Sequence, residues 1–232
     1  MSYQNQLYAN FSKPSATLDW RTFVTAGYTV PPRNTNSLAR AFQKENVFVD
    51  PQSQALILRV KGGSTTDGKV ECAGIFTKIK TICYGSFRCV LKAPPSNAGT
   101  VVGFFFYGDD KHEIDIELLT HRKANTIVNC TVHEIERDER GRAKECSHRE
   151  VDVGFDLSED FHEYRFDWTQ DAVTFYVDST EICQLHTNIP QQPGCVTLNH
   201  WSSGDVGFSK GPPECDVDLK VKEIDLRCFN LK

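Results

Sequence analysis

The chain has 232 residues, of which 39% are hydrophobic and 25% charged, and its formal net charge is −5. This profile is that of a soluble globular protein, long enough to bury a substantial core without metals or disulfides. The acidic balance and the lack of a basic stripe exclude nucleic acid as a partner. No apolar run reaches the roughly 20 residues that span a bilayer, which excludes a membrane partner. No signal peptide is visible at the N-terminus, so we expect a cytoplasmic monomer, or a secreted one if a signal was removed.

The pattern along the chain is one of short apolar runs separated by Gly, Pro, Asn and Asp. Residues 1–37 contain Pro14, Pro31 and Pro32, which predicts an extended N-terminal segment that wraps around the body. Beyond it, twelve runs rich in Val, Ile, Phe, Tyr and Thr predict strands. These runs are Asn46–Val49, Ala55–Val60, Ala73–Lys78, Gly85–Lys92, Val101–Tyr107, Glu113–Leu118, Thr126–His133, Glu163–Trp168, Ala172–Val177, Glu181–His186, Gly194–His200 and Cys215–Arg227.

Helical periodicity is nearly absent, and neither an internal repeat nor a linker interrupts the chain. We therefore predict a single domain over residues 1–232, an all-β jelly-roll sandwich of two antiparallel sheets. The mixed-charge run Glu134–Arg149 predicts a solvated loop. Nine cysteines without a C-x-x-C pair favour buried free thiols with one or two disulfides, and do not resemble a zinc site.

The run His112–Leu119 alternates strictly between polar and apolar residues. On a strand, Glu113, Asp115 and Glu117 project from one face while Ile114, Ile116 and Leu118 project from the other. Three acids on one sheet face raise one another's pKa values, and a purely structural strand gains nothing from that arrangement. A solvent-facing acidic edge strand is the alternative, but the flanking runs are too apolar for an edge.

The chemistry that suits this row is retaining glycoside hydrolysis, which needs two carboxyls roughly 5–5.5 Å apart. Residues four apart on a flat strand have Cα atoms roughly 13 Å apart, so the outer pair must lean inward on a curved strand. The middle acid, Asp115, can hydrogen-bond the nucleophile and hold the protonation pattern.

Several segments, taken in order, resemble glycoside hydrolase family sixteen, which includes lichenases, laminarinases and xyloglucan endotransglycosylases. They are Tyr84–Pro94, Gly99–Tyr107, Glu113–Glu117, His162–Trp168, Val173–Asp178 and Leu198–Gly204. The resemblance implies a concanavalin-like jelly roll with a concave cleft, with Glu113 as nucleophile, Glu117 as acid/base and Asp115 as the assisting acid. The strand has no inserted residue, as in lichenases and transglycosylases, and Gly211-Pro212-Pro213 resembles fungal members.

The substrate-binding candidates depart from the lichenase pattern. Arg88 and Val90 stand where an F-E-x-R-x-K pattern has Glu and Arg, and the loop before Glu113 is short and lacks a Trp. We expect the substrate to contact seven side chains besides the acids: Arg88, Phe105, Tyr107, Thr131, His133, Asn199 and Trp201. The last of these is the expected stacking platform. Relatives often carry a structural calcium, but no diagnostic cluster indicates one here, so we expect neither metal nor cofactor.

The leading hypothesis is therefore a retaining endo-β-glucanase-like hydrolase that acts on a β-glucan or another oligosaccharide. One alternative is a transglycosylase on cell-wall glucan, in which an acceptor sugar replaces water. Another is a biosynthetic enzyme on a small hydrophobic metabolite, with the acids as general acid and base. A lectin-like binder is a further alternative, against which the intact acids argue.

Overall fold

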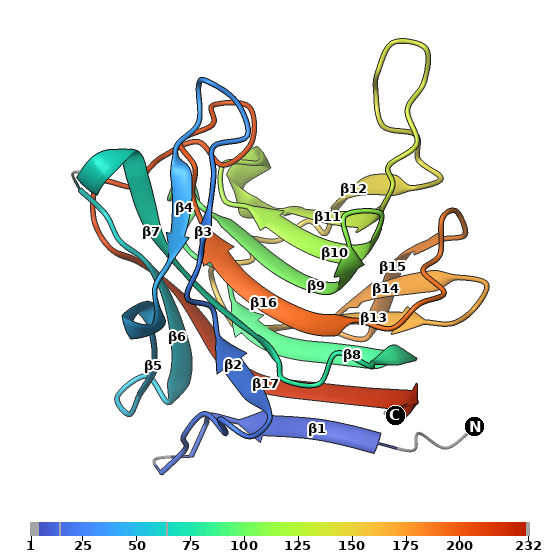
Figure 1. Cartoon of the computed structure of the whole chain (residues 1–232), viewed down its shortest axis with the longest axis horizontal. Coiled ribbons are helices and arrows are strands. Elements are labelled where there is room, and N and C mark those ends of the chain that lie inside the picture. Colours follow the sequence, from blue (N-terminus) through green and yellow to red (C-terminus); the bar gives the residue numbers. More distant parts are fainter. Residues whose placement is uncertain (1–4, 14, 64, 231–232) are drawn as a thin grey trace.

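The computed structural model describes residues 5–13, 15–63 and 65–230, and its described part is almost entirely β (Figure 1). The strands are β1 (Asn5–Asn10), β2 (Phe23–Thr25), β3 (Thr29–Val30), β4 (Ala39–Phe42), β5 (Val47–Asp50), β6 (Ala55–Val60), β7 (Lys69–Thr77), β8 (Cys83–Lys92), β9 (Val101–Asp109), β10 (His112–Leu119), β11 (Ile127–Val132), β12 (His148–Asp152), β13 (His162–Trp168), β14 (Val173–Val177), β15 (Thr180–Leu185), β16 (Cys195–Trp201) and β17 (Val217–Asn230). Three short 3₁₀ helices, η1 (Lys44–Asn46), η2 (Thr66–Gly68) and η3 (Lys123–Asn125), interrupt them. None of the helices in this described part has the length and apolar character needed to cross a membrane.

The strands form two stacked, curved sheets (Figure 1). The first sheet runs β15-β14-β13-β8-β17-β6-β5, with β1 added alongside β17. The second runs β12-β11-β10-β9-β16-β7-β4-β3, with β2 added alongside β7. This confirms the predicted all-β jelly-roll sandwich. The prediction of purely antiparallel sheets needs one correction, because β4 and β7 pair in parallel.

The main core lies between the two sheets and is dense in aromatic side chains. Trp168 is fully buried, its ring centre is 4.3 Å from that of Phe106, and its indole N–H donates to the carbonyl of Pro190 at 3.1 Å. A smaller apolar group, here called the β4 cluster, packs separately from this core. It consists of Ala26, Phe42, Val60, Val70, Cys72, Val101, Leu119 and Trp201.

All twelve predicted strands are present, as β5–β11 and β13–β17. Five further strands were missed: β1–β4 and β12. Residues 5–10 are extended, as expected, but they pair along their length with β17 rather than wrapping freely. β2 and β3 are only three and two residues long, too short to show alternation. β2 pairs with the remote β7, and β3 pairs with the four-residue β4. β12 begins at the end of the mixed-charge loop, which projects from the sheets, and its exposed charges hide any alternation (Figure 1).

The cysteines need a second correction, because all nine are unpaired and all lie in the described ranges. Six of them are buried, and most occupy separate strands, where a thiol packs as a small apolar side chain. A core of this size does not depend on covalent cross-links.

We predict that Trp168→Ala lowers the free energy of unfolding by about 3–5 kcal/mol, because it removes a fully buried aromatic side chain and leaves a cavity. Urea titration followed by circular dichroism measures the change. Val206→Ala, at a side chain that is 78% exposed, is the control and is expected to change stability by less than about 0.5 kcal/mol.

Candidate active site

The acidic row lies on β10, on the face of the second sheet that points away from the core. Ile114, Ile116 and Leu118 are each at most 1% exposed and pack between the sheets. Strand alternation therefore places Glu113, Asp115 and Glu117 on the opposite face. The strand pairs with β9 in unbroken register from Glu113 to Leu119, so it has no bulge within the motif, as the missing insertion predicted.

Register with the neighbouring strands extends this row into a surface. Tyr107 lies beside Glu113, and Phe105 and Thr131 flank Asp115. Gly103 lies beside Glu117 and Asn199 beside Gly103. Residues in register share a face, so seven of the predicted site residues come from four strands, β9, β10, β11 and β16, to one side of the sheet.

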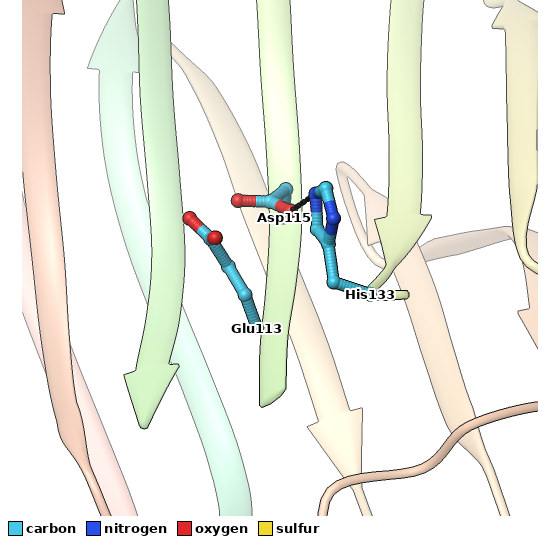
Figure 2. Close-up of side chains that lie close together, drawn as sticks. All are labelled: Glu113, Asp115 and His133. Carbon is cyan, nitrogen blue, oxygen red and sulfur yellow. Dashed lines mark ion pairs between the residues drawn. The ribbon is translucent and has the colours of Figure 1, made fainter. Parts of the chain in front are cut away.

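His133, directly after β11, contacts the middle acid. Its Nε2 lies 3.2 Å from Oδ2 of Asp115, and Figure 2 shows the Glu113 and Asp115 carboxyl groups turned toward each other beside it. The neighbouring Thr131 hydroxyl lies 2.8 Å from Nδ1 of His148. His133 therefore lies beside the acids, and its role as a substrate contact stays a prediction.

The three carboxyls raise one another's pKa values. Burial, and then the Asp115 charge, raise the pKa of Glu113 to about 9. Burial and the Glu113 charge raise the pKa of Glu117 to about 7. Burial and the Glu117 charge also hold the pKa of Asp115 well above its ordinary value. Since the acids cannot all ionise near neutral pH, the row retains protons that hydrolytic chemistry can use.

The order of these pKa values matters for assigning roles. In the free protein the proton resides on Glu113 more firmly than on Glu117, whereas a nucleophile must be ionised. A side-chain hydrogen bond between Glu113 and Asp115 adds to the raised pKa of Glu113 and lowers that of Asp115, so in the free protein it favours the proton on Glu113. The protons thus belong to the acidic row as a unit.

Tyr107 and Phe105 are partly exposed on the same face as the acids. The Tyr107 hydroxyl donates to Oδ1 of Asp110 at 2.8 Å, and burial together with this acid raises the pKa of the phenol to about 12. Tyr107 is therefore a neutral donor and acceptor throughout the ordinary pH range.

Asn199 lies beside a glycine that gives its side chain room. A Cβ added at Gly103 would lie 2.6 Å from Oδ1 of Asn199. That oxygen is buried and has no hydrogen-bond partner among the described residues. An unsatisfied buried acceptor is costly, and it points to a donor supplied by a ligand.

Trp201 is not the open stacking platform that the sequence suggested. It is 8% exposed and belongs to the β4 cluster. Phe208 stacks on it with ring centres 5.8 Å apart, and the Arg40 guanidinium lies 4.5 Å from the centre of its ring. The segments around β4, which the sequence pattern did not identify, cover the indole that was expected to receive a sugar.

Arg88 does not reach this site. It lies on β8 in the other sheet, where it forms ion pairs with Glu163 and Glu223 and lines a polar hollow of about 800 Å³ on the outer face. Its assignment as a substrate contact rested on aligning β8 with a sugar-binding strand. In the sheet that carries the acids, the strand next to β16 is β7 and not β8. β7 places Gly74 beside Asn199 and Phe76 beside Thr197.

The structure also adds residues that the sequence analysis missed. Thr197 and Phe76 continue the Asp115 row, and the amide of Asn129 donates to the main-chain oxygen of Glu117 at 3.1 Å. Alternation along β7 and β16 could have indicated Phe76 and Thr197. No sequence signal could have placed Arg40, since its strand was not recognised.

Oxygen and nitrogen atoms of Glu113, Asp115 and His133 lie within 4.8 Å of one another, close enough to surround a cation. The Asp115–His133 ion pair and the Glu113–Asp115 hydrogen bond account for that proximity. The expectation of a metal-free site stays a prediction.

The fold and the site define a class: a curved jelly-roll sandwich with a row of partly protonated acids on the open face of one sheet. The family described as Glycosyl hydrolases family 16 matches residues 34–221, and the chain belongs to that family. It is 30% identical over 154 residues to a beta-glucanase of Paenibacillus polymyxa, covering 64% of this chain and 60% of that protein. It is 35% identical over 124 residues to a xylanase/beta-glucanase of Ruminococcus flavefaciens, covering 51% and 14% respectively.

In three dimensions the chain is similar to the Bacillus licheniformis beta-glucanase, with a TM-score of 0.76 and 24% identity over 96% of this chain and 97% of the other. That likeness supports the fold. The chain spans at most about 60% of the length of the two curated relatives compared. Both relatives are bacterial, so they lend no support to the fungal affinity suggested by Gly211-Pro212-Pro213.

We predict that Glu113→Gln stabilises the fold, and increasingly so as pH rises. The folded protein holds the Glu113 proton up to about pH 9, whereas a carboxyl with the ordinary pKa of 4.5 loses it earlier. The folded state therefore binds more protons between these values, and the free energy of unfolding falls as pH increases. The amide has no such titration. We expect a melting-temperature gain at pH 8.5 of at least about 2–4 °C, corresponding to about 1 kcal/mol.

Differential scanning fluorimetry at pH 4.5, 6.5 and 8.5 measures this gain. Glu181→Gln, at an exposed position on β15, is the control and should track the wild type at every pH. A Glu113→Gln gain that is constant across the three pH values would contradict a raised pKa for Glu113.

Proposed function

We propose that this protein is a retaining endo-acting glycoside hydrolase of the β-glucanase type. The observation that carries the proposal is the β10 row, in which Glu113, Asp115 and Glu117 share one face and have mutually raised pKa values. Membership of family 16 and the beta-glucanase names of its relatives support a β-glucan as substrate. A glucan oligosaccharide is accordingly the proposed partner.

In the proposed reaction, Glu113 attacks the anomeric carbon while Glu117 donates its proton to the leaving oxygen. A pKa near 7 suits Glu117 to this task, because the group is protonated often enough to donate and is readily ionised afterward. In the second half, ionised Glu117 takes a proton from water, and the resulting nucleophile releases the sugar from Glu113. The anomeric configuration is retained because two displacements occur.

Asp115 prepares the nucleophile. In the proposed reaction it takes the proton of Glu113 as the substrate binds, so that Glu113 becomes ionised before attack. Its contact with His133 fixes the carboxyl on the side away from Glu113. Asp115 is therefore a positioning and proton-holding residue between the two reacting acids.

Activity toward mixed-linkage β-glucan tests this proposal. We expect Glu113→Ala and Glu117→Ala to lower kcat by at least about 10³-fold, because each removes a group that acts on reacting atoms. Reducing-end release is the measurement, and Glu181→Gln serves as the unaffected control. A wild type inactive on every β-glucan would contradict the proposed function, and products longer than the substrate would identify transglycosylation instead.

The two roles are separated by azide rescue on an aryl β-gluco-oligosaccharide whose leaving group needs no protonation. Azide fills the space left by the nucleophile in Glu113→Ala and is expected to form the α-glycosyl azide. In Glu117→Ala it intercepts the covalent intermediate and is expected to form the β-glycosyl azide. The reverse pattern would exchange the roles of Glu113 and Glu117.

The pH profile tests the part assigned to Asp115. Removing its charge with Asp115→Asn lowers the pKa of Glu113, since that charge is the main cause of the raised value after burial. We expect the acidic limb of the kcat/KM profile to move to lower pH while kcat falls at every pH. An acidic limb that stays in place would show that ionisation of Glu113 does not govern it.

A further inference from the structure

Arg40 stands at the end of the acidic surface that lies beside the β4 cluster. On β4, its neighbours Ala39 and Ala41 are buried, and the guanidinium of Arg40 rests over the ring of Trp201. It lies close enough to Glu117 for the two charges to interact, yet the two form no ion pair.

This guanidinium has no acidic partner, unlike the chain's comparable arginines. Arg59, Arg88 and Arg165 have side chains 26–30% exposed, and each lies within 4.0 Å of a carboxylate. Within the described ranges, the Arg40 guanidinium makes neither an ion pair nor a hydrogen bond, and it lies over the ring of Trp201. Burial lowers its pKa, as expected for a cation removed from water without compensation.

A half-buried cation without a counterion is costly unless something else supplies one. The other charged groups that act on Arg40 are Glu117, which must be protonated to serve as an acid, and Arg33, which adds repulsion. The nearby Asn199 Oδ1 is a second polar atom without a protein partner. The guanidinium is a donor without an acceptor, and the amide oxygen is an acceptor without a donor. The two form no hydrogen bond with each other.

We propose that this end of the acidic face is a subsite for a sugar residue that carries an anionic group, a carboxylate or a sulfate ester, bound by Arg40. A guanidinium presents paired N–H donors that match the oxygens of either group. Asn199 accepts a hydroxyl of the same residue, and Glu117 lies at the adjoining bond. That the ligand is a glycan rests on the proposed function, while the requirement for an anion rests on Arg40 itself.

The test compares oligosaccharides that differ in one group only. Isothermal titration calorimetry is performed with a neutral gluco-disaccharide, its glucuronate counterpart and its 6-sulfate. We expect the wild type to bind at least one acidic form at least about tenfold more tightly than the neutral one. The form that gains identifies the anion. Raising the salt concentration should weaken only the acidic ligand, since charge attraction is screened.

Arg40→Gln is expected to abolish the preference, and Arg40→Lys to keep part of it, because an ammonium retains the charge without the paired donors. Arg165→Gln is the matched control. Arg165 likewise lies over an aromatic ring, 4.0 Å from the centre of Tyr176, but on the outer face of the other sheet, and its variant should keep the full preference.

Equal binding of acidic and neutral forms by the wild type, or no measurable binding of either acidic form, would overturn the proposal. So would a preference that survives in folded Arg40→Gln. The salt titration uses the wild type alone, so it tests the requirement for an anionic ligand even if that variant does not fold. Hydrolysis of β-glucan is scored separately, so an inactive protein that prefers acidic ligands refutes only the proposed function.

Discussion

The alternation of β10 is the constraint on which the site depends. Burial of Ile114, Ile116 and Leu118 between the sheets fixes the register of this strand, since a shift by one residue would turn three acids into the core. The same packing forces Glu113, Asp115 and Glu117 onto one face, close enough to repel. The energy of the hydrophobic core thus holds together a group of charges that would otherwise separate.

That enforced proximity makes the acids chemically useful. Isolated carboxyls on a strand would be ionised at neutral pH and could not donate protons. Here burial and mutual repulsion retain protons on the row, and the Glu113–Asp115 hydrogen bond together with His133 decides where they lie. Packing these acids side by side costs stability, and the same repulsion produces the raised pKa values on which the proposed acid and nucleophile roles depend.

Several side chains around the row shape the acidic face. Trp201 is covered by Phe208 and by Arg40, so the acidic face near β4 presents a guanidinium where an indole face was expected. Because Gly103 lacks a side chain, Asn199 can lie against the strand next to Glu117. These side chains lie at the end of the acidic face where the anionic subsite is proposed, and they are not part of the acidic motif itself.

Local pattern alone determined much of this protein. Period-two alternation in His112–Leu119 identified the acids, their common face and the apolar residues beneath them, because side-chain direction on a strand follows from sequence spacing. Regular apolar runs likewise predicted twelve of the strands. Only the tertiary structure decided that β7, and not β8, adjoins β16 on the acidic side, which removed Arg88 from the site. It also brought Arg40 from a four-residue strand to within reach of Trp201 and Glu117, because pairing between remote strands leaves no periodic trace in either segment.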